Sequence, residues 1–162
     1  MNDSYNHKDF CEEMARSLRL ISHTDTHRAF LLVSGSEAYT LLDDILSSID
    51  GPILIAIEQG EDKSVMNRAD CLEERFPYSL LIAIPTDNDD TSTICAAERQ
   101  SLECLRQVRN TLIARYGQRI DGYHIFPSGP IGDNFYGSVL QYSWLEYPDY
   151  SVDQAYFNGT EE

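Results

Sequence analysis

Basic residues are scarce in this sequence of 162 residues, which has 12 Lys and Arg against 27 Asp and Glu and a formal net charge of −15 at pH 7. A surface of that charge repels phosphate groups, so neither nucleic acid nor an anionic membrane is expected as a partner. No run approaches the ~20 apolar residues of a membrane-spanning helix. The first residues lack both the basic and the apolar region of a secretory signal. We therefore expect a cytoplasmic protein.

Closely spaced cysteines are also missing. The four cysteines, Cys11, Cys71, Cys95 and Cys104, include no C-x-x-C pair, which disfavours a zinc cluster or a redox motif. Cys95 and Cys104 fall in one predicted helix about 13 Å apart along its axis, too far for a disulfide. All four are expected as reduced thiols, and these two as small core residues.

No established catalytic motif is present. The sequence lacks a nucleophile elbow, a P-loop and a dinucleotide-binding glycine fingerprint. The segment Asp87–Glu98 resembles a calcium loop at several positions, but Ser92 stands where that loop requires glycine. The prediction is a non-enzymatic protein with no cofactor and no bound metal.

Two short segments keep other functions open. Ser34, Gly35 and Ser36 form a turn between a predicted strand and a predicted helix, where a helix N-terminus can bind an anion. This turn favours a small-ligand or anion-binding regulatory domain as the alternative function. A third hypothesis is a metal-dependent enzyme that uses His23, Asp25 and His27, since the two histidines have an i, i+4 spacing. An ordinary capped turn and solvated histidines are the simpler interpretations.

The sequence does contain a regular succession of helical and strand patterns. Apolar residues at helical spacing predict helices over residues 5–21, 38–49 and 91–116, with Ser36 as the N-cap of the second. Short apolar runs predict strands over residues 29–33, 53–57, 80–84, 123–126 and 137–147. Residues 53–57 and 80–84 are apolar throughout, which is typical of strands covered on both faces. Residues 58–78 are predicted as a long polar connection, and residues 127–134 as the loop of a hairpin.

This order of elements predicts an α+β fold. We expect a single domain over residues 1–147, with a mixed sheet of about five strands, about three helices and a C-terminal hairpin. Residues 148–162 have no periodic pattern and are predicted as an acidic, aromatic-containing tail. In the long helix, Ile94, Leu105, Val108 and Leu112 form the predicted buried stripe, with Arg106 on the solvent side.

Aromatic residues are concentrated near the C-terminus. Ten of the 17 aromatic residues fall within residues 121–162, a segment without Lys or Arg. One hairpin cannot readily bury all of them, and exposed aromatic rings favour contact with a protein partner. Stacking on nucleic acid would require nearby cations, and core packing remains an alternative. The candidate interface residues are Tyr136, Tyr142, Trp144, Tyr147, Tyr156 and Phe157.

The segments Phe76–Pro85 and Gly132–Tyr142, together with the long helix that ends at Tyr116, resemble small phage tail-terminator or neck-type structural proteins. The resemblance covers residues 53–147 as an order of elements. It implies a sheet with helices on one side, a ring that closes a tail tube, and no catalysis. The leading hypothesis is therefore a self-associating structural protein of phage or prophage tail-completion type. It would be a homo-oligomer or a ring on a protein partner, found in the cytoplasm or assembled in a virion.

Overall fold

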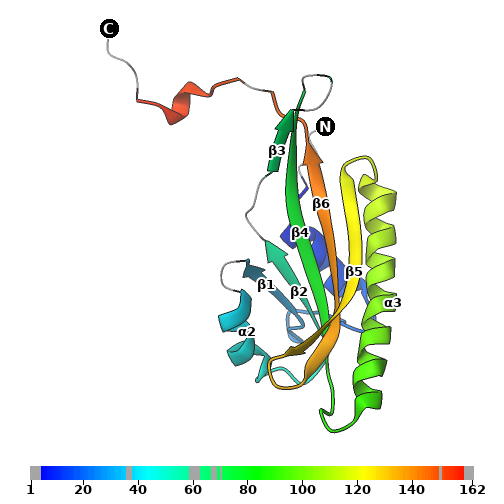
Figure 1. Cartoon of the computed structure of the whole chain (residues 1–162). Coiled ribbons are helices and arrows are strands. Elements are labelled where there is room, and N and C mark those ends of the chain that lie inside the picture. The colour runs from blue at the N-terminus through cyan, green and yellow to red at the C-terminus, as the bar shows by residue number, and fades with distance from the viewer. Residues whose placement is uncertain are drawn as a thin grey trace.

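The computed structural model describes residues 5–35, 38–58, 63–66, 69, 71–149 and 151–158. Its elements in chain order are α1 (His7–Ser17), β1 (Phe30–Ser34), α2 (Ala38–Leu46), β2 (Ile53–Glu58), β3 (Lys63–Met66), β4 (Leu72–Pro85), α3 (Thr91–Tyr116), β5 (Ile120–Ile131), β6 (Phe135–Glu146) and the 3₁₀ helix η1 (Gln154–Tyr156) (Figure 1). The described residues thus form three α-helices and one mixed sheet of six strands, which confirms the predicted α+β fold and its C-terminal hairpin.

The sheet is organised around the long strand β4. The strand order is β1-β2-β4-β6-β5, and β3 also pairs with β4. Strands β1 and β2 are parallel and are joined through α2, as a crossover connection requires. The other pairs are antiparallel. One edge of β4 pairs first with β3 and then with β2, while β6 runs along the other edge.

Helices cover both faces of the sheet, and each face has its own buried core. Alternate residues of a strand point to opposite faces, so Leu80 packs with α1 and α3 while its neighbour Leu81 packs with α2. The tip of the β5–β6 hairpin completes the second core, to which Phe135 and Val139 belong. The resemblance described above implies helices on one side only. The structure differs because the β1–α2–β2 crossover places α2 on the face opposite α1 and α3.

Helix α3 has the predicted bounds and nearly the predicted buried stripe. Its N-cap is Asp90, whose carboxylate accepts a hydrogen bond from the Ser92 amide at 2.9 Å. The buried residues are Ala97, Ser101, Leu105, Val108 and Leu112, whereas Ile94 is only half-buried. The prediction that Cys95 is a core residue is wrong, because its position on the helix points to solvent, and Cys104 is half-buried. Helices α1 and α2 each end about one turn earlier than predicted.

Two predicted connections are strands instead. Residues 63–66 form β3 and residues 72–79 form the first half of β4, so the expected long connection over residues 58–78 is wrong. Residues 127–131 likewise continue β5, which leaves a short turn before Phe135. These stretches are uncovered on one face, so polar residues alternate with apolar ones there. Phe76 and Tyr78 pack against the helices, while Arg75 lies on the other face and forms an ion pair with Asp121 at 3.0 Å.

Beyond β6 the chain leaves the body of the molecule. Figure 1 shows residues 148–149 and 151–158, with η1, extending away from the end of the sheet where β3 lies. Within the described residues, no helix combines the length and the apolar character needed to cross a membrane.

Candidate functional site

The structure divides the six predicted interface residues into two groups. Tyr142 and Trp144 are only 2% and 5% exposed, because even-numbered residues of β6 face α1 and α3, so neither can serve as an interface residue in this fold. Tyr136 is half-buried, and its ring lies against Gly129 of β5. Tyr147, Tyr156 and Phe157 are 51%, 86% and 61% exposed. The exposed part of the predicted interface is therefore the tail and its attachment to β6.

An aromatic cluster around Tyr5, near the start of the chain, includes two of the ten C-terminal aromatic residues, Tyr142 and Trp144. Tyr5 stacks on Trp144 with ring centroids 4.6 Å apart, and it meets Tyr78 and Tyr116 edge-on at 5.5 Å each. Phe10 packs beside Tyr5 as well. Aromatic pairs of this geometry stabilise a core beyond the area that they bury. Tyr142 and Trp144 thus have aromatic partners within the chain, in Tyr5 just before α1 and, for Trp144, in Tyr116 of α3.

A chain of buried hydrogen bonds connects α1 to the sheet. His7 donates its Nε2 proton to the Ser79 carbonyl at 3.0 Å, so its Nδ1 is the acceptor for the Tyr142 hydroxyl at 2.8 Å. The Tyr142 oxygen in turn accepts a hydrogen bond from the Tyr5 hydroxyl. Each polar side chain of this hydrogen-bonded network has a partner, as buried polar groups require. The network fixes α1 against β4 and β6.

Cys11 lies beside His7, in an arrangement that superficially resembles a catalytic thiol and its base. The Cys11 sulfur is 3.7 Å from His7 Nδ1, and the two residues have the i, i+4 spacing of one helix face. Burial raises the pKa of the Cys11 thiol, and it lowers the pKa of His7 from 6.5 to about 4. A reactive cysteine needs the opposite shift, toward the thiolate. The pair is therefore neutral at pH 7 and acts as packing. The i, i+4 spacing was the sequence signal that could have revealed it.

Acid should weaken the fold through His7. Its pKa is about 4 in the folded chain and 6.5 when unperturbed, so neutral His7 contributes its full stabilisation above pH 6.5. This contribution is lost as the pH falls from 6.5 through 4, and it amounts to about 3 kcal/mol. We expect denaturant melts to show that the fall in unfolding free energy between pH 7 and pH 4 is smaller in His7→Gln than in the unsubstituted chain. The exposed His27→Gln is the matched control. Equal slopes in the His7→Gln variant and the parent would contradict the assignment.

The structure does not unite the three residues of the metal hypothesis. The Nδ1 atom of His23 accepts a hydrogen bond from the Ala29 amide at 3.0 Å. Asp25 is exposed and paired with Arg16 at 2.9 Å, and His27 is exposed. Among the residues that the structure describes, no three His, Cys, Asp or Glu side chains are arranged to hold a metal ion. His23 and Asp25 line an open hollow of about 370 Å³ beside Phe30.

The other two ligand-binding segments serve local structure. The Gly35 amide of the proposed anion-binding turn donates to the Glu58 carbonyl at 2.6 Å, and Ser36 lies outside the described residues. Asp87 accepts a hydrogen bond from the Asp89 amide at 3.0 Å, and Asp90 caps α3. The acidic residues before α3 thus stabilise a turn and a helix N-terminus.

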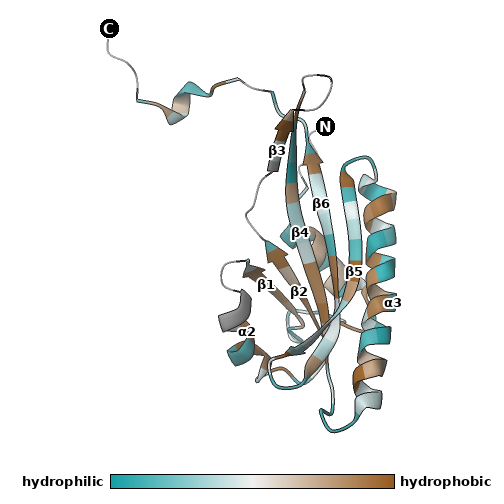
Figure 2. Cartoon of the chain, in the orientation of Figure 1, coloured by the Kyte–Doolittle hydropathy of each residue, from teal (hydrophilic) through white to brown (hydrophobic). Residues whose placement is uncertain are grey.

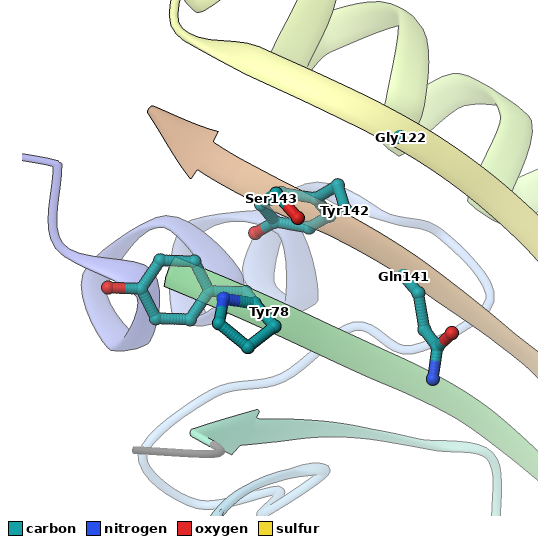
Figure 3. A pocket seen from close by; sticks show the side chains of 6 residues that line it. Tyr78, Gly122, Gln141, Tyr142 and Ser143 are labelled. Carbon is teal, nitrogen blue, oxygen red and sulfur yellow. The ribbon is translucent and has the colours of Figure 1, made fainter. Parts of the chain in front are cut away.

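A second hollow, of about 160 Å³, is lined by residues of β4, β5 and β6, all of them uncharged. Figure 3 shows Gln141 and Ser143 of β6 around it, with Gly122 on the neighbouring strand β5. The lining offers hydroxyl and amide groups but no charge that would select a ligand. The hollow thus has no specific chemistry of its own.

Exposed apolar side chains gather at one end of the molecule. Six of the eight large exposed apolar residues identified among the described residues lie in β3 or beyond β6: Val65, Met66, Tyr147, Val152, Tyr156 and Phe157. The pairings of Met66 with Leu72 and of Glu146 with Glu74 bring β3 and the end of β6 to the start of β4. Figure 2 shows the hydrophobic part of β3, in brown, close to the point where the tail leaves the sheet. We call the six exposed residues named above the apolar end.

Comparison of the sequence with models of protein families and with curated proteins gives no match. The fold and this surface define an α+β domain whose exposed apolar residues are concentrated at one end and in a projecting tail.

Proposed function

We propose that this protein is a self-associating, non-enzymatic assembly protein, of the phage or prophage tail-completion type that its order of elements resembles. The apolar end is the observation that carries the proposal. Exposed apolar side chains that are concentrated in one part of a molecule favour protein–protein contact. Tyr and Phe are also enriched in the central part of interfaces.

The local structure of the tail supports a binding role. Asp153 caps η1 by accepting a hydrogen bond from the Ala155 amide at 2.9 Å, and the Asp149 carboxylate accepts one from the Ser151 amide at 2.9 Å. These turns restrain the backbone on both sides of Val152 and present Tyr156 and Phe157 to solvent. A segment that is partly ordered before binding loses less conformational entropy in the complex.

The burial of the potentially reactive side chains of the core supports the non-enzymatic part of the proposal. Cys11 and His7 are buried, and both are neutral at pH 7 because of the pKa shifts described above. Tyr142 is buried beside them, and burial raises the pKa of its hydroxyl. All three side chains are used in holding α1 on the sheet.

Substitution of the tail aromatics should weaken self-association. We expect the full chain to form oligomers in sedimentation-velocity experiments, and the double variant Tyr156→Ser, Phe157→Ser to need at least about tenfold higher concentration for the same assembly. Leu32→Ser, an exposed position in β1 outside the apolar end, is the matched control and should leave assembly unchanged. A full chain that stays monomeric at every soluble concentration, or assembly that is indifferent to the tail substitutions, would contradict the proposal.

A further inference from the structure

Helix α3 is cationic although the whole chain is strongly acidic. It has four Arg against two Glu, a net charge of +2 in a chain of −15. In α1, by contrast, two basic residues stand against three acidic ones. Two copies of the chain, each with a net charge of −15, repel one another over most of their surface. A second copy is therefore attracted most strongly where its acidic groups can meet α3.

Three of the four arginines of α3 lie along one face of the helix, two of them fully on the solvent side. Arg115 is held by Glu13 of α1 through two hydrogen bonds of 2.7 and 2.8 Å. Arg99 and Arg106 are exposed on the side of the helix opposite its buried residues, in line with the exposed Ile113, and Arg109 is half-buried at the border of that side. Their spacing repeats every three, four or seven residues, which keeps them on one stripe. We call Arg99, Arg106, Arg109 and Ile113 the arginine face.

Few carboxylates neutralise the arginine face. Arg106 pairs with Glu103 on the same helix at 2.6 Å. Arg109 bonds the side chain of its neighbour Asn110, and for Arg99 the described part of the chain offers no ion pair. Arginine on an exposed helix can bind carboxylates through paired N–H groups and stack on aromatic rings. The face therefore suits an acidic segment that also has aromatic residues.

The tail of this chain has that chemistry and matching dimensions. Asp149 and Asp153 are exposed and four residues apart, followed by the exposed Tyr156 and Phe157. Four residues of extended chain span at most about 14 Å, and Arg99 and Arg106 are about 10 Å apart along the helix axis. The two carboxylates can thus reach both arginines, while the aromatic residues continue toward Ile113.

A second copy can place Asp149 on Arg99, whereas the same chain cannot. The Tyr147 ring lies 5.8 Å from the guanidinium carbon of Arg119, just beyond the C-terminal end of α3. Asp149 is two residues further on and gains about 7 Å of reach, while Arg99 lies about 26 Å from Tyr116 along the axis. Asp149 of the same chain therefore cannot meet Arg99.

From these observations we propose that the arginine face of α3 binds the acidic aromatic tail, residues 148–158, of a second copy of this chain. The inference rests on the proposed function and names its partner and contact. Because the tail and the face are different surfaces, the contact is heterologous. Repetition of such a contact closes a ring if the rotation between copies allows it, and otherwise builds a filament.

Charge reversal on the two surfaces tests the contact. The tail variant is Asp149→Lys, Asp153→Lys, and the face variant is Arg99→Glu, Arg106→Glu, both in the full chain. We expect each alone to weaken self-association at least about tenfold in sedimentation velocity. An equimolar mixture should restore association, because the reversed tail of one variant meets the reversed face of the other. Matched controls reverse equal numbers of exposed charges elsewhere: Asp43→Lys with Asp44→Lys, and Arg19→Glu with Arg28→Glu.

The outcomes separate the contact from the function. If the unsubstituted chain associates but the mixture does not regain association, the tail and the arginine face are not partners, and self-association itself stands. The same conclusion follows if the controls weaken association as much as the reversals do. If the unsubstituted chain does not associate at all, both the contact and the proposed function are wrong.

Discussion

Replacing Gly137 by alanine should prevent the chain from folding. A Cβ atom at this position would lie 1.7 Å from the carbonyl oxygen of Ile82 and 2.8 Å from its carbonyl carbon. These are backbone atoms of β4, and Gly137 pairs with the adjacent Ala83 in the middle of the sheet. Relief of the clash requires the two strands to separate between both cores. We expect a cost above about 4 kcal/mol, the range of the most damaging single substitutions.

Urea melts followed by circular dichroism measure this effect. Gly51→Ala is the matched control, because a Cβ atom there meets nothing within 4 Å and the residue has no positive φ. The control should change the unfolding free energy by less than about 1 kcal/mol. A Gly137→Ala chain that unfolds within 1 kcal/mol of the parent would show that β4 and β6 are further apart than described.

Truncation of Leu105 should have the next largest effect. Its side chain is 0% exposed in the core between α3 and the sheet. Leu105→Ala is expected to cost about 3–5 kcal/mol, through lost apolar burial and the cavity left behind. The adjacent Arg106 is the control, because its side chain is 47% exposed and Arg106→Ala should cost less than about 0.5 kcal/mol in a dilute sample. Denaturant melts in which Arg106→Ala is the more damaging would show that α3 is rotated from the described orientation.

The elements that were predicted correctly are those whose pattern of apolar and polar residues can be recognised within the element itself. Helix α3 has an uninterrupted helical period between the N-cap Asp90 and Gly117, so its bounds were predictable from the residues alone. Residues 53–57 are apolar because β2 is covered on both faces, and that pattern is equally local.

The errors have a common physical cause. The first half of β4 is covered on one face only, so charged residues such as Arg75 interrupt its pattern. Pro77, which cannot donate a backbone hydrogen bond, is also untypical of a central strand. The strand exists because it pairs with β3 and β6, and such pairings between distant segments leave no mark in a local pattern.

The candidate site was predicted only in part, again because contacts between distant segments leave no mark in a local pattern. Exposed Tyr156 and Phe157 follow from a tail with no periodic pattern. The burial of Tyr142 does not, because its hydroxyl contacts His7 across 135 positions of sequence. Similarly, the arginine face required knowledge of which side of α3 meets the sheet.

The long central strand has a mechanical consequence. Strand β4 runs without interruption from Leu72, beside the apolar end, to Pro85 in the body of the molecule. It pairs with β6 from Glu74 to Pro85. A force that a bound partner applies at the apolar end along β4, against β6, therefore loads these backbone hydrogen bonds together in shear, instead of peeling them apart one at a time. Tension that enters β4 at Leu72 is therefore carried along paired strands to both cores.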